Sequence, residues 1–579
     1  MSRKVKYVFI LIALFYTWAF FFFKWSSHDG DGWKYVISSD GKGYYAYLPK
    51  LFIDKNLTYI EHDCLFTIPT EKGFINRYYC GTAVLETPFF LMGHFSAKIF
   101  NYKVDGYSEP YALFIGLSAI FYFLAGLYFL YKLLKEKLHL PDNYLIWVLL
   151  LVCFGTNLLY YTIIKGSFSH VYSFFLITTF FYAVYKLSIG VSRKWVAIAS
   201  VLLGLVIVTR PVNVMIVLLI PAFFENFTAF FRFIKSLFMP KPLLIIVVSL
   251  ALPVFIQALF WFLQTGEWNQ WSYKQEGFYF TNPQIVEVLF GFRRGLFVYT
   301  PLLFIALFGF FFLFKQSKYK AIWGVLFFVT FTYVTASWWN WTYGDSYSLR
   351  PFVDITVIFA LLLALLISNI GVVMRKLVLS FALLFSILQT VYAYQYYAGI
   401  TDITNMTRDK FFYLFLKTSD KHMNYYGGID DIPPFAPNGF DTIHKYVETY
   451  DEFPAGHRDT RGELWLGGTE FTYPQEKHYV RHLWIEVTYR YKITHPHDMG
   501  EVLYAFHSFP PDSDSTKAYF TFRAKEYPTE KTDTWFTAHH KIWFPNSVDG
   551  NDRIKLYFWN RGEEHFLLDD YTITVMVPK

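Results

Sequence analysis

Long apolar runs, separated by short polar segments, fill the chain up to about residue 400. A helix needs about 20 mostly apolar residues to cross a bilayer, and by that measure the sequence predicts about eleven spans. They lie at roughly 7–25, 110–132, 143–163, 169–188, 195–209, 211–225, 242–264, 295–314, 321–339, 351–370 and 377–397. The first run is too long for a signal-peptide core and lacks a small-residue cleavage site, so we expect it to remain as a span.

Basic residues occur in short clusters between the apolar runs, and these clusters predict the orientation. Lys and Arg are enriched in cytoplasmic loops. With an odd number of spans and a cytoplasmic N-terminus, every such cluster falls on the cytoplasmic side and the C-terminus lies outside. The clusters are Arg3, Lys4 and Lys6; Lys132, Lys135 and Lys137; Arg193 and Lys194; Arg232, Lys235 and Lys241; Lys315, Lys318 and Lys320; Arg375 and Lys376.

The predicted external segments are long, in particular the first, at about 26–109. It contains an apolar run, 81–100, that is interrupted by Glu86, Pro88, His94 and Lys98. A run of this kind predicts a helix lying at the membrane surface rather than a further span. Two more external segments cover 265–294 and 338–350.

Beyond residue 399 the pattern changes from apolar runs to alternation of apolar and polar residues. Alternation predicts half-buried strands, for example at 482–491, 518–523, 553–559 and 571–577. Several short strands separated by turns indicate a β-sandwich. We therefore expect a membrane all-α domain (1–399), a proline-containing linker (400–440) and an external β-sandwich domain (441–579).

Composition agrees with a membrane protein. Hydrophobic residues make up 54% of the chain and charged residues 17%, whereas soluble chains carry about 25% charged residues. The net charge of +7 does not indicate nucleic-acid binding, because the basic residues fall in the topology clusters. A Cys64–Cys80 disulfide is compatible with an oxidising exterior, and no spacing typical of metal ligands occurs. We expect no cofactor, although a divalent metal cannot be judged from the sequence.

The segment 39–49, SDGKGYYAYLP, follows the first span on the outside. An acidic residue at this boundary would be partly desolvated, which raises its pKa and makes it a better base. Asp40 is therefore the candidate for taking a proton from an acceptor hydroxyl. The alternative is a simple turn, since Asp-Gly is a frequent turn pair; Asp29 and Asp31 are rival acids.

Several segments in this order resemble the GT-C superfamily of membrane glycosyltransferases, which has many spans and an acidic residue in the first external loop. They are 39–49, 81–90 (GTAVLETPFF), 167–172 (SFSHVY), 209–213 (TRPVN), 294–301 (RGLFVYTP) and 338–351 (WWNWTYGDSYSLRP). Related sequences tend to have Gly at the position of Ser348, so that loop is expected to differ. The resemblance covers about residues 1–400 and implies an inverting sugar transfer from a polyprenyl-phosphate donor, with Asp40 as the base.

The resemblance and the chemistry together give the other candidate residues. Expelling a phosphate requires fixed cations, and arginine matches phosphate oxygens well. The candidates at predicted external helix ends are Lys165, Arg210, Arg293, Arg294 and Arg350, of which Arg210 and Arg294 lead. Snorkelling to lipid headgroups, or pairing with Asp345 or Asp354, are the alternatives. The remaining candidates for substrate contact are Tyr44, Tyr45, Glu86, His170, Trp339, Tyr343 and Asp345. The tryptophans near 339 fit either sugar stacking or an interfacial aromatic belt.

The end of the chain, 553–561 and 568–575, resembles the last strands of jelly-roll domains of the carbohydrate-binding-module type. Sugar binding, packing on the membrane domain and binding of a protein partner all remain open for this part of the chain.

The sequence thus predicts a glycosyltransferase of a bacterial inner membrane that acts at the periplasmic face. Its partners would be a polyprenyl-phosphate sugar, a glycan, lipid or protein acceptor, and membrane lipids. A transporter or flippase would be expected to show repeats and charges at the bilayer midplane, and a polymerase or ligase of lipid-linked glycans would show a large late external loop. A mere anchor would not need this many spans.

Overall fold

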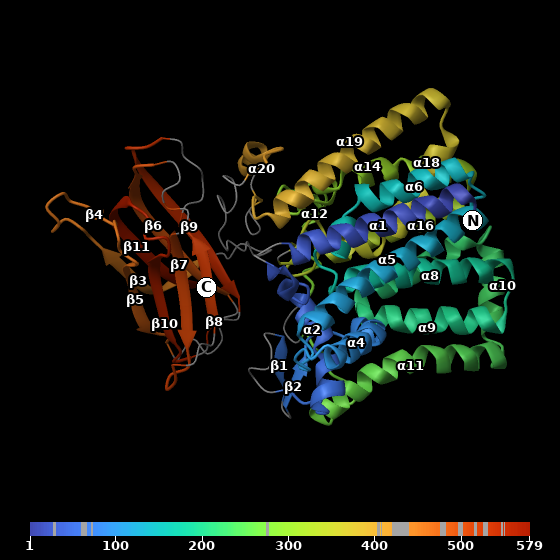
Figure 1. Cartoon of the computed structure of the whole chain (residues 1–579), viewed down its shortest axis with the longest axis horizontal. Coiled ribbons are helices and arrows are strands. Elements are labelled where there is room, and N and C mark those ends of the chain that lie inside the picture. The colour runs from blue at the N-terminus through green and yellow to red at the C-terminus, as the bar shows by residue number, and fades with distance from the viewer. Residues whose placement is uncertain are drawn as a thin grey trace. The chain divides into compact units, whose positions relative to one another are not determined.

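A computed structural model describes residues 1–26, 30–59, 66–70, 73–273, 277–344, 346–401, 406, 408–419, 439–474, 482–495, 499, 502–514, 518–524, 531–545, 548 and 550–578. The chain forms two compact units (Figure 1). The first comprises Met1–Phe278, Leu296–Ala336 and Tyr347–Thr390, and the second comprises Tyr279–Gly295, Ser337–Ser346 and Val391–Lys579.

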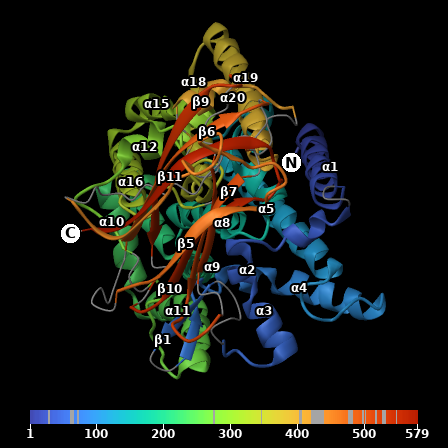
Figure 2. The same cartoon turned by 90° about the vertical axis from the view of Figure 1, so that its left-hand side faces the viewer.

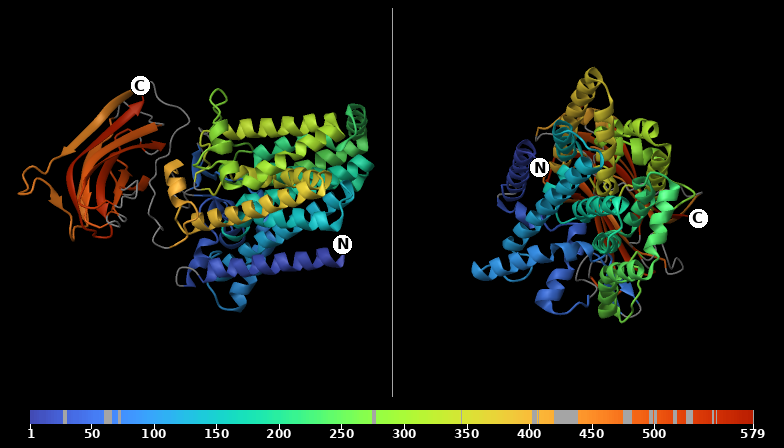
Figure 3. Two further views of the ribbon diagram at one scale, coloured as in Figure 1. Left: turned by 90° about the horizontal axis from the view of Figure 1, so that it is seen from above. Right: turned by 90° about the vertical axis from the view of Figure 1, so that its right-hand side faces the viewer.

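The first unit is mainly helical. Its elements are α1 (Arg3–Trp25), η2 (Gly32–Tyr35), α2 (Asp40–Tyr45), α3 (Tyr47–Pro49), η3 (Lys50–Asp54), β1 (Thr67–Thr70), β2 (Gly73–Asn76), α4 (Gly81–Ile99), α5 (Glu109–Lys137), α6 (Asp142–Gly155), α7 (Leu158–Ile163), α8 (Ser169–Ile189), α9 (Arg193–Thr209), η4 (Pro211–Phe223), α10 (Phe227–Leu237), α11 (Pro240–Thr265), α13 (Leu296–Tyr299), α14 (Pro301–Leu307), α15 (Gly309–Gln316), α16 (Lys318–Ala336), α17 (Pro351–Asp354), α18 (Thr356–Asn369) and most of α19 (Val372–Tyr397). The long helices lie side by side (Figure 3).

Helix α8 lies at the centre of this bundle. It packs against α5 and α9, and α9 packs in turn against α11. Over the most apolar 18-residue stretch of α8, 72% is buried, whereas over the corresponding stretch of α11 only 17% is buried. Because both helices are apolar, α11 presents its side chains outward as a lipid-facing helix does, whereas α8 forms the interior.

Among the described residues, six helices are long and apolar enough to cross a membrane, namely α1, α5, α8, α11, α16 and α19, and the bent pair η4–α10 would make a seventh. Three shorter apolar segments lie at Asp142–Gly155, Pro301–Gln316 and Thr356–Asn369. The chain is therefore polytopic by length and composition, but the predicted number of about eleven spans is not confirmed. The difference arises where predicted spans are short or broken, as at η4 and α10, which meet at 119°.

Proline determines where the helices near the site begin and end. Arg210, directly before Pro211, has an extended backbone (φ −151°, ψ 106°) that ends α9 and starts the 3-10 helix η4. The residue before a proline is sterically kept out of the α conformation. Pro351 begins α17 directly after Arg350, whose own backbone is helical (φ −55°, ψ −32°). Both arginines therefore lie at helix ends.

Helix α4, which the sequence predicts to lie at the membrane surface, runs across the direction of the long helices (Figure 2). It packs mainly against α5 and also contacts α9. Its carboxylate at Glu86 faces inward and is fully buried. The position of α4 relative to a bilayer remains a prediction.

The second unit is rich in strands and includes α12 (Ile285–Phe290) and α20 (Arg408–Leu414). Its strands are β3 (Phe440–Glu448), β4 (Arg458–Asp459), β5 (Trp465–Thr472), β6 (His482–Ile493), β7 (Val502–Phe509), β8 (Ala518–Arg523), β9 (Trp535–Pro545), β10 (Arg553–Asn560) and β11 (Phe566–Pro578). They form two antiparallel sheets, β5-β10-β7-β8 and β3-β11-β6-β9, with β4 added to β11.

One hydrophobic core joins the two sheets of the second unit. Side chains of β6, β7, β10 and β11 alternate between this core and the outside, for example Ile554, Leu556 and Phe558 inward. The four strands that the sequence predicts are confirmed as β6, β8, β10 and β11, because period-two alternation is a direct consequence of strand geometry. Residues 420–438 of the predicted linker lie outside the described residues.

Candidate functional site

Asp40 is the first residue of α2, a short helix that follows α1 and η2. The residue before it, Ser39, has a left-handed backbone (φ 51°), which is rare for a residue other than glycine and tends to occur at functional sites. The next residue, Gly41, allows close packing, since a Cβ there would lie 2.0 Å from Ser167 Oγ. The segment before α8 is thereby held against α2.

Asp40 forms an ion pair with Arg350, a residue 310 positions away in the sequence. Arg350 Nη1 lies 2.5 Å from Asp40 Oδ2, and the side chains are 14% and 19% exposed, respectively. The Arg350 guanidinium also lies 5.7 Å from the centre of the Phe168 ring. The pair is thus largely shielded from water, and its Asp40 end retains some access.

The charge of Arg350 changes the acidity that the sequence predicts for Asp40. Burial by itself raises the pKa of Asp40, but the charge of Arg350 and hydrogen bonds from Tyr78 and Arg350 outweigh burial and hold the pKa below its usual value. The expected raised pKa is therefore wrong. The sequence could indicate desolvation, but it could not indicate the cation that three-dimensional folding brings to Asp40.

A second cluster surrounds Asp354, the last residue of α17, which is fully buried. His170 Nδ1 lies 2.7 Å from Asp354 Oδ1, and Arg210 Nε lies 3.0 Å from Oδ2. Asn213 donates its amide to Oδ2 at 2.8 Å. One carboxylate thus fixes a histidine from the start of α8 and an arginine and an asparagine from the corner between α9 and η4.

Tyr44 connects the two clusters. Its phenol hydrogen-bonds to Ser169, and the charges of Arg210, Asp40 and Arg350 all act on it. Burial is the largest effect and raises the pKa of Tyr44, so the phenol is neutral and can donate a hydrogen bond. Two carboxylates, two guanidiniums and a phenol therefore share one region of the first unit.

Five of the predicted site residues are brought together here: Asp40, Tyr44, His170, Arg210 and Arg350. Asp354 was anticipated only as a possible partner of an arginine, while Tyr78 and Ser169 were missed as contacts of Asp40 and Tyr44. Asn213 lies in the TRPVN segment together with Arg210. The short spacing of the two residues around Pro211 is the sequence signal from which a shared partner could have been inferred.

Two other predicted residues of the first unit have contacts of their own. Tyr45 is fully buried and its hydroxyl donates to the carbonyl of Gly106. Glu86 accepts a hydrogen bond from the Tyr172 hydroxyl at 2.9 Å, and that hydroxyl lies 2.6 Å from Ser118 Oγ. Burial raises the pKa of Glu86 well above its usual value, so the group is a neutral acid in the packing between α4 and α8.

The remaining predicted residues belong to the second unit. Arg294 donates to the carbonyl of Gly344 at 3.2 Å and lies 5.4 Å from the Tyr396 ring. Trp339 packs against Trp484 and Met576. Tyr343 has a left-handed backbone (φ 58°), and Asp345 lies outside the described residues.

Ser348, where related sequences tend to have Gly, also has a left-handed backbone (φ 52°). The loop therefore keeps the conformation that glycine adopts most easily, and its hydroxyl lies 3.4 Å from Thr300 Oγ1.

Cys80 and Cys153 are buried and have free thiols, and Cys64 lies outside the described residues, so the pairing predicted for it is not described. Over the part of the chain that the structure describes, no group of three His, Cys, Asp or Glu side chains is arranged to hold a metal ion.

No protein-family model matches the chain, and no curated protein sequence matches it. Among solved structures, it is similar to the oligosaccharyltransferase AglB of Archaeoglobus fulgidus in complex with an inhibitory peptide and a dolichol-phosphate, with 12% identity over 68% of this chain and 56% of that one, at a TM-score of 0.37. It is also similar to the arabinosyltransferase EmbB of Mycobacterium smegmatis, with 11% identity over 100% of this chain and 65% of that one, at a TM-score of 0.39.

The chain therefore spans less than two thirds of the length of either match. The two matches are similarities at low identity to an oligosaccharyltransferase and an arabinosyltransferase. The C-terminal part of this chain is rich in β-strands.

Proposed function

We propose that the protein is a membrane glycosyltransferase that transfers a sugar from a polyprenyl-phosphate donor to an acceptor hydroxyl, with Asp40 as the base. The observation that carries the proposal is the meeting of Asp40 and Arg350 beside the Asp354 cluster with Arg210 and His170. A carboxylate close to two fixed guanidiniums provides a proton acceptor and a phosphate-binding surface in one place.

In the proposed step, the acceptor oxygen attacks the anomeric carbon while the bond from that carbon to the phosphate oxygen breaks. The proton of the acceptor passes to Asp40, and the electron pair leaves with the phosphate on the carrier lipid. Arg210 and Arg350 stabilise the developing negative charge. Attack opposite to the leaving group inverts the anomeric centre, as the sequence resemblance implies.

Asp354 is a positioning residue in this proposal. It is fully buried and contacts Arg210 and His170, and it fixes their orientation rather than touching the sugar. Rigid placement of cations matters because stabilisation of a developing charge depends on donors that need not reorganise during the reaction.

An apolar pocket of about 390 Å³ in the first unit supports a lipid-linked donor. Its lining consists of Tyr47, Leu48, Leu51, Phe52, Ala83, Val84, Thr87, Pro88, Ile256 and Phe260. The Tyr47 hydroxyl donates to the carbonyl of Tyr78 at 2.6 Å, and the Tyr78 side chain hydrogen-bonds to Asp40. Tyr78 thus contacts both Tyr47 of the pocket lining and Asp40.

The finer parts of the proposal come from the sequence. The basic clusters favour a cytoplasmic N-terminus, about eleven crossings and a site at the outer, periplasmic face of a bacterial inner membrane. The acceptor would be a glycan, a lipid or a protein on that side.

The proposal is tested by comparing the wild type with Asp40→Asn in lipid nanodiscs. Each is incubated with radiolabelled polyprenyl-phosphate sugars and an extract of envelope lipids and glycans. Asparagine keeps the shape of the side chain and removes the base, so we expect transfer to fall at least about 100-fold. Asp54→Asn is the matched control, since Asp54 is half exposed and pairs only loosely with Lys50 at 3.8 Å.

Transfer by the wild type and by Asp54→Asn, combined with its loss in a folded Asp40→Asn protein, supports the proposal. Equal activity of Asp40→Asn would remove Asp40 from the role of base. A wild type that binds the carrier lipid but transfers no sugar from any donor would refute the enzymatic proposal and favour a transporter.

A further inference from the structure

Three aromatic side chains lie together on the outer face of the β5-β10-β7-β8 sheet, far along the chain from the candidate site. Trp465 on β5 stacks with Trp559 on β10, with ring centres 5.7 Å apart and planes at 17°. Tyr557 on β10 meets Trp465 edge to face at 5.3 Å. Trp465 is 53% exposed, so one broad ring surface faces water.

A β-bulge places Trp465 on this face. Gly468 pairs with Tyr557, and Trp465 pairs with Trp559, so that β5 has one residue more than β10 over this stretch. Without the extra residue, Leu466 would pair with Trp559 on the outside. Instead, Leu466 is fully buried in the core, and Trp465 points outward. Bulges are specific features that redirect side chains.

Glycine makes the bulge possible. Gly467 has φ +111°, a backbone that other residues rarely adopt, and a Cβ there would lie 2.6 Å from the Tyr571 hydroxyl in the core. A Cβ on Gly468 would lie 2.7 Å from the Cβ of Tyr557. Because Gly467 and Gly468 have no side chains, the part of β5 beside Tyr557 is flat.

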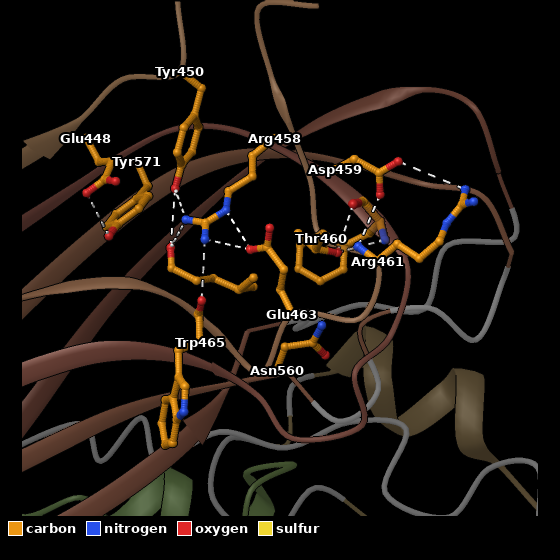
Figure 4. A network of polar contacts seen from close by, with 12 residues as sticks. Glu448, Tyr450, Arg458, Asp459, Thr460, Arg461, Glu463, Trp465, Asn560 and Tyr571 are labelled. Carbon is orange, nitrogen blue, oxygen red and sulfur yellow. Dashed lines mark hydrogen bonds and ion pairs between the residues drawn. The ribbon is translucent and has the colours of Figure 1, made fainter. Parts of the chain in front are cut away.

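A network around Arg458 holds the bulge in place (Figure 4). Arg458 donates to the carbonyls of Leu466 at 3.0 Å and Trp465 at 3.4 Å, and it pairs with Glu463 at 2.6 Å. The Trp465 indole points away from this network (Figure 4). The backbone at the bulge is thus fixed by an arginine while the ring stays exposed, which is the arrangement of a preorganised binding residue.

The surroundings of the rings define the chemistry of a ligand. Lys555 is exposed on the same face, 5.7 Å from the Tyr557 ring, and Arg561 lies 6.0 Å from the Trp559 ring. Glu470 is exposed opposite Lys555. A ligand that fits has a flat apolar face for the rings and many hydroxyl groups at its edges for the charged side chains. Sugar rings in a chain have both properties.

We infer that the Trp465–Tyr557–Trp559 platform binds a carbohydrate chain. The platform shares no residue with the Asp40 cluster, and the inference does not depend on sugar transfer. A large aromatic surface that a glycine bulge and an arginine network keep exposed is otherwise costly, because exposed apolar surface favours aggregation.

The test measures binding of three hexasaccharides, cellohexaose, chitohexaose and mannohexaose, to the full-length protein in nanodiscs without any donor, by titration calorimetry. We expect saturable binding of at least one, weakened roughly tenfold or more by Trp465→Ala. Trp465→Phe, which keeps a ring, should lose less. The matched control is Trp535→Ala, which removes a tryptophan from β9 of the other sheet.

A selective effect of Trp465→Ala, with unchanged thermal unfolding and with Trp535→Ala within twofold of the wild type, supports the inference. It is overturned if none of the three hexasaccharides binds, if Trp465→Ala binds as the wild type does, or if both tryptophan variants lose binding equally. Because no donor is present, these outcomes are independent of whether Asp40 supports transfer.

Discussion

At the scale of the residue, the acidity of Asp40 depends on a balance between burial and Arg350. Burial favours the neutral carboxyl, and the guanidinium 2.5 Å away favours the carboxylate and prevails. The pKa in the folded protein is therefore depressed. The ion pair contributes stability above the ordinary carboxyl pKa, and this contribution is lost as the pH falls through the depressed value.

Replacing Arg350 with Gln is expected to change the pH dependence of transfer. Without the guanidinium, burial prevails and the pKa of Asp40 rises, so the acid limb of kcat/KM moves to higher pH by at least about one unit. The measurement is the pH profile of residual transfer. Lys103→Gln, which removes an exposed cation, should leave the limb where it is in the wild type. If the acid limb of kcat/KM lay at the same pH in Arg350→Gln as in the wild type, Arg350 would not be the group that lowers the pKa of Asp40.

At the scale of the element, the site depends on the contact of α2 with the segment that precedes α8. Ser167 donates to the carbonyl of Val36 at 2.8 Å, and Gly41 packs directly against Ser167. These contacts fix the distance from Asp40 at the start of α2 to His170 in the first turn of α8. Two short segments from distant parts of the chain are thereby held as one rigid site.

Adding a methyl group at this contact should separate α2 from α8. In Gly41→Ala the new Cβ would lie 2.0 Å from Ser167 Oγ, and a displacement of about 1 Å can cost on the order of 100-fold in rate. We expect kcat/KM to fall by about that factor. Gly190→Ala, where a Cβ meets nothing within 4 Å, should retain wild-type activity. The double variant Gly41→Ala, Ser167→Gly should regain part of the lost kcat/KM, because it removes the side chain that the new methyl group meets. If Gly41→Ala alone were as active as the wild type, the close packing of Gly41 on Ser167 would not matter for the site.

At the scale of the whole molecule, a helical unit with lipid-facing apolar helices is combined with a β-rich unit. From the basic clusters we propose that the N-terminus is cytoplasmic and that the β-rich unit lies outside. If both proposals hold, sugar transfer and carbohydrate binding belong to the same side of the membrane.

The orientation can be tested by labelling single cysteines in spheroplasts with a membrane-impermeant maleimide, in a background with Cys64→Ser. Cys80 and Cys153 are buried and should react little. We expect Asp451→Cys, exposed in the β-rich unit, to react from outside. Gly190→Cys, exposed after α8, should react only after permeabilisation. The reverse pattern would show the opposite orientation.

Patterns that follow from local geometry could be predicted from the sequence alone. Apolar runs indicated the membrane helices and alternation indicated β6, β8, β10 and β11, because each depends only on the period of one element. The proline corner at Arg210 is also local. The motifs identified Asp40, Arg210 and Arg350 one by one.

Only the tertiary structure decided which of these residues act together. It paired Asp40 with Arg350 across 310 positions, gave Arg210 and His170 a common partner in Asp354, and assigned Glu86 to packing with Tyr172. It also turned Trp465 outward through a bulge that alternation could not predict. The physical reason is that charge pairing, burial and register depend on neighbours in space, which a one-dimensional pattern does not contain.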